Sequence, residues 1–201
     1  AAAEQDIPVV VLDRPNPNGF YIDGPVLEPP FKSFVGLHPV PVVYGMTIGE
    51  YALMVNGENW LENKRRCQLK VIPLAGYSRD MIFQLPVRPS PNLPDWKSVY
   101  LYPSLCFFEG TIVSVGRGTT SPFRVFGHPD LPEGQFSFTP VSMPGAAVKP
   151  LLMNTLCHGK NLSEYAENYA PHLPGLNLTW LTYAHEHLKE KHKFFNNYFD
   201  T

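Results

Sequence analysis

The chain has 201 residues, of which 44% are hydrophobic and 17% are charged, and its formal net charge at pH 7 is −2. This balance is typical of a folded protein and excludes a disordered chain. It also argues against a nucleic-acid partner, because Lys and Arg form no basic stripe that could neutralise phosphates.

The cysteines, prolines and aromatic residues further restrict the structural and functional class of the protein. The three cysteines form no CxxC pair, which argues against a disulfide framework and against a zinc site. No apolar run has the length of a membrane span. The 22 prolines predict long ordered loops and short elements. Loops rich in aromatics suit a carbohydrate site, although packing is the commoner role of any single aromatic.

The chain is predicted to begin with the end of a helix over residues 1–5 and a strand over residues 8–12. The strand is apolar throughout, as in a parallel sheet that is buried on both faces. Because a domain rarely begins halfway through a βα unit, we expect the preceding part of this domain to be missing from the chain.

A turn-forming run, DRPNPNG, follows this strand at residues 13–19. In open α/β sheets, ligands bind in the loops at the carboxyl ends of the strands. Asp13, Arg14 and Asn16 are therefore candidate site residues. An equally good interpretation is a structural turn in which Asp13 and Asn16 bond to nearby backbone groups.

The next helix has a clear start, because Thr47 and Glu50 have the spacing of a capping box. Glu50 is therefore interpreted as a helix cap before it is considered as a catalytic group. Residues 68–74 are predicted to form a strand that packs on this helix. The buried face of the helix is predicted to consist of Tyr51, Leu53, Met54 and Trp60.

Loops are predicted at residues 76–79 and 89–94, and a short helix is predicted to begin at Asp95 and to end at Pro103. The apolar run at residues 105–108 predicts a short buried strand. This strand would lead directly into the most polar motif of the chain.

Two strands and a long helix are predicted after that motif. The strands cover residues 123–126 and 135–141, and the helix covers residues 178–195. The two histidines on one face of the helix are predicted to pack half-buried rather than to bind a metal. That face carries Leu178, Leu181, His185, Leu188, His192 and Phe195.

The most polar motif, EGTIVSVGRGTT, occupies residues 109–120. Gly116 and Gly118 permit positive φ or a close approach of the backbone to a ligand. Arg117 offers a planar group that can bind a carboxylate in two places. Residue types support two interpretations equally: Glu109 and Arg117 line a pocket for an anionic sugar, or they form an internal ion pair that holds a loop.

A nucleophilic hydrolase based on Cys106 is disfavoured. Cys106 lies in an apolar run, where thiols are buried and inert. None of the seven histidines has an obvious partner in the sequence. A cysteine-dependent hydrolase is therefore the least favoured function for this sequence.

Six motifs follow one another along the chain. They are DRPNPNG at residues 13–19, HPVPVVYGMTIGE at 38–50, PSPN at 89–92, FEGT at 108–111, GRGT at 116–119 and PF at 122–123. Together they resemble the NamZ-like exo-β-N-acetylmuramidases. The resemblance covers the chain from its first residues to about residue 160 and departs from the family pattern at Ile112, where a polar residue is expected.

The resemblance implies a fold that passes from α/β to α+β, with an active cleft between a Rossmann-like half and a mixed α+β half with long Pro-rich loops. Residues 1–35 would then be the end of a truncated Rossmann-like domain, including the last strand of its parallel sheet. Residues 36–201 would form one wall of the cleft. In the family, the N-terminal Rossmann-like half carries a Glu-His-Gly motif, which is absent from this chain.

Members of this family remove N-acetylmuramic acid from the non-reducing end of peptidoglycan fragments. The resemblance therefore implies a bacterial glycosidase that is exported to the periplasm or the medium and takes muropeptides as substrates. A non-catalytic module that binds cell-wall sugars is the alternative. We expect neither a cofactor nor a metal.

The chemistry of this substrate suggests roles for the charged candidates. Glycoside cleavage uses carboxyl groups, and Glu109 is the catalytic candidate. The lactyl carboxylate of N-acetylmuramic acid calls for a cation. Arg117 is the first choice for that role, followed by Arg14 and Arg79.

The remaining candidates are polar or aromatic. His38 or Tyr44 could orient the 2-acetamido group, if that group assists the cleavage. The other residues predicted to bind substrate are Asp13, Asn16 and Thr119.

Overall fold

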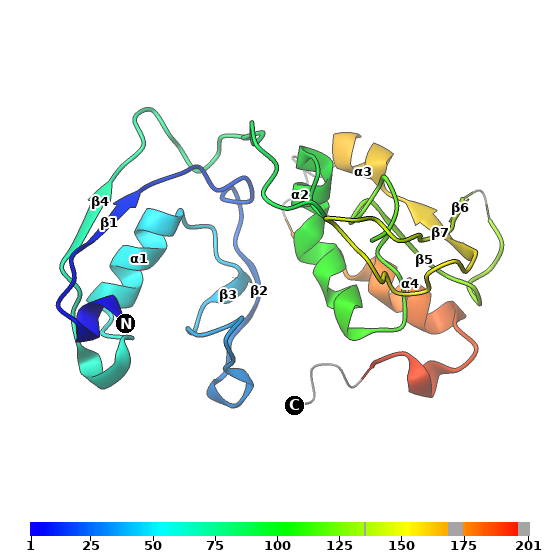
Figure 1. Ribbon diagram of the computed structural model, residues 1–201, viewed down its shortest axis with the longest axis horizontal. Helices are drawn as coiled ribbons and strands as arrows, with labels where there is room; N and C mark the ends of the chain where they lie inside the picture. The colour runs from blue at the N-terminus through cyan, green and yellow to red at the C-terminus, as the bar shows by residue number, and fades with distance from the viewer. Residues whose placement is uncertain (135, 169–174, 197–201) are drawn as a thin grey trace. The chain divides into compact units, whose positions relative to one another are not determined.

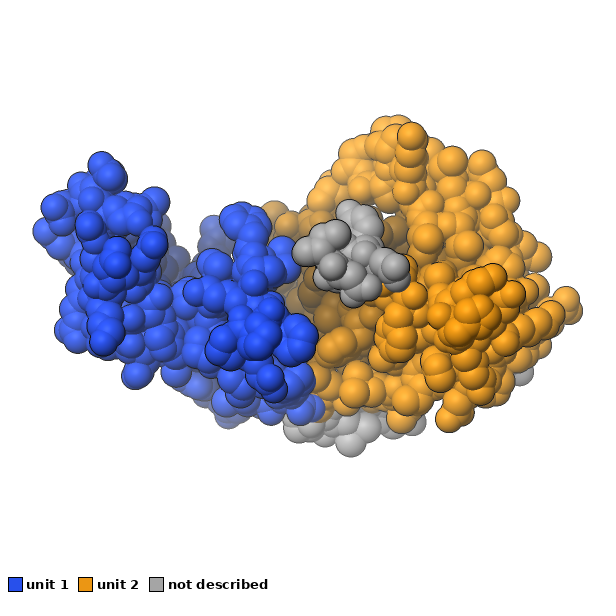
Figure 2. Space-filling model, turned by 90° about the horizontal axis from the view of Figure 1, so that it is seen from below, with its two compact units in different colours: residues 1–83 blue, residues 84–201 orange. Residues whose placement is uncertain are grey.

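The computed structural model describes residues 1–134, 136–168 and 175–196. It has mixed α/β content with small parallel and antiparallel sheets (Figure 1). The chain divides into two compact units, residues 1–83 and residues 84–201, which Figure 2 shows in separate colours.

Unit 1 (residues 1–83) contains a parallel and an antiparallel strand pair and one α-helix. β1 pairs in parallel with β4, and β2 pairs antiparallel with β3. The helix α1 packs against β1 and β4. In chain order the elements are the 3-10 helix Ala2–Glu4, β1 Val9–Leu12, β2 Asp23–Val26, the 3-10 helix Pro29–Phe31, β3 Pro41–Val43, α1 Ile48–Gly57, the 3-10 helix Glu62–Lys64 and β4 Leu69–Ile72.

This pairing explains where the chain divides. The parallel partner of β1 lies some sixty residues later in the sequence, and α1 connects the two strands. Unit 1 therefore extends to Phe83. The domain boundary was predicted after residue 35, so unit 1 also contains residues that were assigned to the second domain.

Within this chain, β1 is covered on one face only, whereas burial on both faces was predicted. Exposure alternates along the strand, and Val10 and Leu12 are 59% and 71% exposed. The opposite face is covered by α1, as the close approach of Gly49 to Val71 shows. Within the part of unit 1 that the structure describes, the face with Val10 and Leu12 has no such cover.

The capping box predicted for α1 is confirmed. Thr47 Oγ1 accepts a hydrogen bond from the backbone N–H of Glu50 at 3.1 Å, and Glu50 Oε2 accepts one from the backbone N–H of Thr47 at 2.9 Å. The predicted buried face is only partly correct, because Leu53 and Met54 are 52% and 39% exposed. Of the predicted face, Tyr51 and Trp60 are half-buried.

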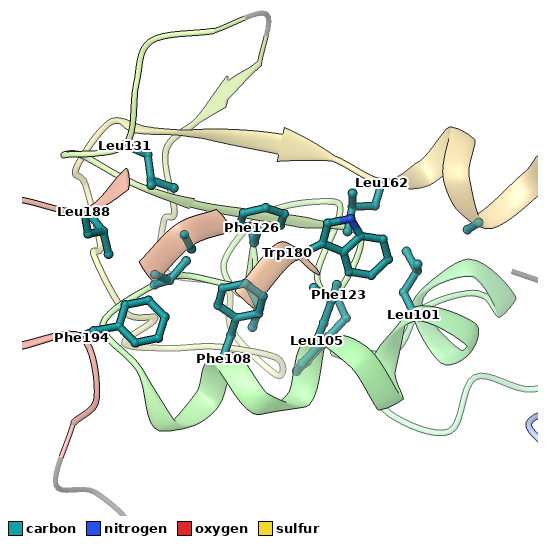
Figure 3. Close-up of a cluster of buried hydrophobic side chains, with 14 residues drawn as sticks. Leu101, Leu105, Phe108, Phe123, Phe126, Leu131, Leu162, Trp180, Leu188 and Phe194 are labelled. Atoms are coloured by element: carbon teal, nitrogen blue, oxygen red, sulfur yellow. The ribbon is translucent and has the colours of Figure 1, made fainter. Parts of the chain in front are cut away.

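Unit 2 (residues 84–201) contains the larger hydrophobic core. Its sheet is antiparallel, with the strand order β5-β7-β6. Its elements are α2 Trp96–Leu105, the 3-10 helix Cys106–Gly110, β5 Val125–His128, β6 Ser137–Phe138, β7 Cys157–Asn161, α3 Ser163–Asn168, α4 Thr179–His187 and the 3-10 helix Lys191–Lys193. Figure 3 shows the core between α2, α4 and the sheet, including Leu105, Phe108, Phe126, Trp180 and Phe194.

The predictions around Pro103 were wrong in two respects. Pro103 does not end α2, which continues to Leu105 and is followed by a 3-10 helix where a strand was expected. Leu101, Leu105 and Phe108 are all at most 2% exposed, and their spacing of four and three residues is helical. The burial of this face outweighs the hydrogen bond that Pro103 cannot donate.

The last helix is shorter than predicted. α4 ends at His187, and Leu188 has extended backbone angles. Among the described residues beyond it, Leu188 and Phe194 are buried, whereas Phe195 is 65% exposed. His185 is half-buried with its ring edge against Phe194, as predicted, but His192 is exposed.

The two strands predicted at residues 123–126 and 135–141 are confirmed only in part. β5 covers Val125–His128, shifted by two residues from the prediction. β6 consists of Ser137–Phe138 alone. Gln135, where that strand was predicted to begin, lies outside the described residues.

Candidate functional site

Six of the nine predicted site residues lie in unit 1 and three lie in unit 2. In unit 1 they form two groups. One group surrounds the N-terminus of α1 and contains Asp13, Arg14, Asn16 and Arg79. The other consists of His38 and Tyr44 beside Tyr51.

Asp13 lies at the N-terminus of α1. Its carboxylate accepts hydrogen bonds from Thr47 Oγ1 at 2.7 Å and from the backbone N–H groups of Gly49 and Arg14, each at 2.9 Å. Gly49 is required here, because a Cβ at this position would lie 2.7 Å from Asp13 Cγ. The helix N-terminus and the hydroxyl group thus hold the carboxylate in a fixed position.

These contacts set the charge of Asp13. Burial alone would raise its pKa, but the hydrogen bonds from Thr47, Gly49 and Arg14 outweigh burial and lower the pKa below the ordinary value. Asp13 is therefore a carboxylate acceptor rather than a proton donor near neutral pH.

The lowered pKa gives a testable pH dependence. Because the folded pKa lies below the unfolded value of about 3.9, the stabilisation by Asp13 is present above that value and is lost as pH falls through the folded pKa. We expect the unfolding free energy of unit 1 to fall as pH drops below about 4, and Asp13→Asn should remove this contribution to the profile. Amide hydrogen exchange at Gly49, measured against pH in both proteins, checks this. Equal profiles in the two proteins would contradict it.

The other residues of this group have mainly structural contacts. Asn16 Nδ2 donates to the carbonyl of Met46 at 2.9 Å, and its Oδ1 accepts from the backbone N–H of Asn18 at 2.9 Å. Arg79 Nη2 pairs with Glu50 Oε1 at 2.8 Å. Both side chains thus hold the N-terminal end of α1, and Arg14 is exposed beside them.

His38 and Tyr44 lie at a cavity of about 720 Å³ in unit 1. His38 Nδ1 is 2.7 Å from the hydroxyl oxygen of Tyr51, and its ring stacks on Trp60 with centroids 5.5 Å apart. The Tyr44 ring lies 5.3 Å from that of Tyr51. The apolar side chains that complete the wall include Val26, Leu27, Phe31, Phe34, Val35, Leu37 and Val42.

These neighbours define what His38 can do. Burial, and then the positive charge of Lys32, lower the pKa of His38 below its ordinary value. The imidazole is therefore neutral at pH 7. Because Nδ1 is bound to the Tyr51 hydroxyl group, Nε2 is the nitrogen left to hydrogen-bond a ligand.

In unit 2, Glu109 and Arg117 form an ion pair. Arg117 Nη2 donates to Glu109 Oε1 at 2.5 Å, and the guanidinium carbon lies 5.1 Å from the centre of the Phe123 ring. Glu109 belongs to a 3-10 helix and not to the strand end that was predicted. The side chains of Glu109 and Arg117 are 28% and 39% exposed, so the pair remains accessible to a substrate.

The glycines beside Arg117 shape its loop. Gly116 and Gly118 have φ values of 76° and 81°. A Cβ on Gly118 would lie 2.5 Å from the carbonyl oxygen of Val141, so the close approach there is made by the chain itself. Thr119 Oγ1 donates to the carbonyl of Gly116 at 2.7 Å, which closes the turn.

The environment of Cys106 disfavours a cysteine nucleophile, as predicted. Burial, with the nearby charge of Glu109 as a smaller cause, raises the pKa of the Cys106 thiol to about 11. Cys106 Sγ lies 3.3 Å from the carbonyl oxygen of Pro103. At neutral pH this thiol stays protonated and is a poor nucleophile.

Some polar side chains that line pockets in the structure were not predicted as site residues from the sequence. Arg88 and Asn92 line a second pocket, of about 320 Å³, together with Thr119. Tyr51 was predicted only as a packing residue of α1, yet its hydroxyl group positions His38. The sequence motifs that contribute to the second pocket are PSPN at residues 89–92, GRGT with Thr119, and PF with Pro122.

Among the residues that the structure describes, no group of three His, Cys, Asp or Glu side chains could hold a metal ion. No helix in the described part of the chain has the length and hydropathy needed to cross a membrane.

Comparisons with known proteins match both units. Residues 1–97 match the family model for the N-terminal part of the exo-beta-N-acetylmuramidase NamZ, and residues 100–201 match the model for its C-terminal part. The chain is 42% identical over 177 residues to the peptidoglycan beta-N-acetylmuramidase NamZ of Bacillus subtilis (strain 168), a match that covers 81% of this chain and 42% of that protein.

Two crystal structures are similar to this chain. A DUF1343 family protein from Bacteroides fragilis NCTC 9343 is 49% identical with a TM-score of 0.91, over 99% of this chain and 56% of its own. A second DUF1343 family protein from the same organism is 30% identical with a TM-score of 0.67, over 80% of this chain and 45% of its own. The chain thus spans about half of the length of these relatives.

Proposed function

The chain belongs to the NamZ family of exo-β-N-acetylmuramidases, and we propose that the complete protein is a glycoside hydrolase that releases N-acetylmuramic acid from the non-reducing end of peptidoglycan fragments. The observation that carries this proposal is the pair of family matches, which together cover residues 1–97 and 100–201. The relative from Bacillus subtilis that is named a peptidoglycan beta-N-acetylmuramidase supports the proposal, because it is 42% identical over 177 residues and matches 81% of this chain.

In this proposal, Glu109 is one of the carboxyl groups that act on the glycosidic bond. Arg117 holds Glu109 Oε1, and in the described part of the chain no hydrogen bond occupies Oε2. Glycosidases commonly use two carboxyl groups, or one carboxyl group together with the substrate's acetamido group. The second group would come from a part of the protein outside this chain.

Unit 1 would contribute to substrate binding. The cavity beside His38 and Tyr44 offers aromatic faces and a neutral imidazole, which suit the apolar face and the amide of an N-acetyl sugar. His38 is our candidate for orienting the 2-acetamido group. The parallel β1–β4 pair, with the exposed Val10 and Leu12, supports the further proposal that unit 1 completes a larger Rossmann-like sheet.

The test is release of N-acetylmuramic acid from a chromogenic muramyl glycoside, by this chain and by the complete protein. We expect release by the complete protein only, because the second catalytic group is proposed to lie outside the chain. Release by the chain alone would contradict that placement and would put the whole reaction within residues 1–201. If neither releases the sugar although both bind it, the glycosidase proposal fails and the protein is a sugar-binding module.

A further inference from the structure

Unit 2 contains a pocket of about 320 Å³ with one charged residue in its wall. That residue is Arg88, and Asn92, Thr119 and Thr120 supply further polar groups. No Asp or Glu lines the pocket. The volume is at the small end of the range for small-molecule sites and suits a single sugar residue or an organic acid.

Arg88 differs from the other arginines of unit 2. Arg117 pairs with Glu109, and Arg124 pairs with Asp95 at 3.1 Å. In the described residues, Arg88 forms neither an ion pair nor a hydrogen bond to another side chain. Its guanidinium group therefore retains all of its donors for a ligand.

The rest of the pocket wall is held by a hydrogen bond and by prolines. Asn92 is only 9% exposed, and its Nδ2 donates to the carbonyl of Ala146 at 3.1 Å, which links the PSPN segment to the loop that contains Ala146. The wall also contains Pro91, Pro94, Pro122 and Pro144. Because proline fixes φ, little ordering of the backbone is needed when a ligand enters.

We propose that this pocket is a carboxylate-binding subsite in which Arg88 binds the ligand's carboxylate through two parallel hydrogen bonds. An unpaired guanidinium group in a concave wall without acidic residues favours an anion, and its planar geometry matches a carboxylate. Resting on the proposed function, the carboxylate comes from the muramyl part of the substrate. Arg88 then takes the role for which Arg117, Arg14 and Arg79 were the sequence-based choices.

Two groups in peptidoglycan could supply the carboxylate. One is the lactyl group of N-acetylmuramic acid, which is free when no peptide is attached. The other is a carboxylate of the stem peptide, since attachment of the peptide converts the lactyl carboxylate to an amide. We assign the lactyl group, because a pocket of about 320 Å³ suits one small acid better than a peptide.

The experiment measures dissociation constants for the complete protein by calorimetry, with N-acetylmuramic acid, N-acetylglucosamine and a free stem peptide as probes. Arg88→Met removes the charge and keeps much of the side-chain length, and Arg88→Lys keeps the charge without the planar fork. The control is Lys189→Met, which removes an exposed cation of unit 2 that does not line the pocket. Thermal melts check that the variants fold.

We expect Arg88→Met to weaken binding of N-acetylmuramic acid by about 10- to 100-fold and Arg88→Lys to weaken it less. Binding of N-acetylglucosamine, which lacks the carboxylate, should not change, and Lys189→Met should match the wild type. Equal losses for both sugars would overturn the proposal, as would unchanged binding of both sugars and the peptide. A loss for the peptide alone would overturn the lactyl assignment. Sugar release is measured separately, so a protein that binds but does not cleave contradicts the proposed function and leaves the subsite standing.

Discussion

Gly159→Ala is expected to destabilise unit 2 by about 3 kcal/mol or more. Gly159 in β7 pairs with Gly127 in β5, and an alanine Cβ at residue 159 would lie 1.9 Å from the carbonyl oxygen of Phe126. The contacted atom belongs to the backbone, so no side-chain rotation can relieve the overlap. The two strands would have to separate.

Separation of these strands would disturb the core directly. The side chain of Phe126 on β5 is fully buried and stacks on Phe108, with ring centroids 5.0 Å apart (Figure 3). Moving β5 therefore opens the centre of the hydrophobic cluster, where close packing makes small displacements costly. The strain and the lost packing act together, which is why the expected effect is large.

Hydrogen exchange of the β5 and β7 amides in the complete protein measures this effect. A loss of about 3 kcal/mol lowers protection by about 100-fold where exchange requires unit 2 to open. Gly134→Ala is the matched control, because a Cβ there has only one neighbouring atom, 4.0 Å away. If Gly159→Ala and Gly134→Ala show equal protection, the crowding between β5 and β7 does not limit stability.

The features predicted well from the sequence are those determined by nearby residues. The capping box of α1 requires only Thr47 and Glu50, and it forms as expected. The alternative of an ion pair between Glu109 and Arg117 was also recognised, since only eight positions separate the two residues. Both depend on short-range spacing that the sequence displays directly.

The features predicted wrongly depend on distant partners. The apolar run at residues 105–108 fits a buried strand or a buried helix equally well, and its packing against Phe126 and Phe194 favours the helical period. The face of β1 that is covered in this chain is decided by α1, which no pattern within the strand reveals.

The candidate site shows the same division. Arg88 was not predicted as a site residue, because the features that make it a candidate appear only in the structure. It lines a pocket that contains no acidic residue, and it has no ion-pair partner within the described residues. Arg117 was selected for its planar guanidinium group, yet it is already paired with Glu109. Residue type identifies which side chains can bind a carboxylate, and the structure shows which of them line a pocket and which are already paired.

Glu109→Gln in the complete protein is expected to lower kcat for muramyl glycosides by about 100- to 10,000-fold, with little change in KM. Glutamine has nearly the same shape and can still accept a hydrogen bond from Arg117, so the loop should keep its conformation. The change removes the ability to ionise or to transfer a proton. Steady-state kinetics on a muramyl disaccharide measure the effect, and Glu133→Gln, an exposed change in the same unit, is the control.

The leaving group distinguishes the roles that Glu109 could have. If Glu109 protonates the leaving oxygen, an aryl glycoside with an acidic phenol should be cleaved by Glu109→Gln at a rate closer to that of the wild type, because such a phenol departs without protonation. If Glu109 acts as a base or a nucleophile, both substrates should lose activity alike. Unchanged kcat on both substrates would remove Glu109 from the chemistry and leave its pairing with Arg117 as a purely structural contact that fixes the loop between Gly116 and Gly118.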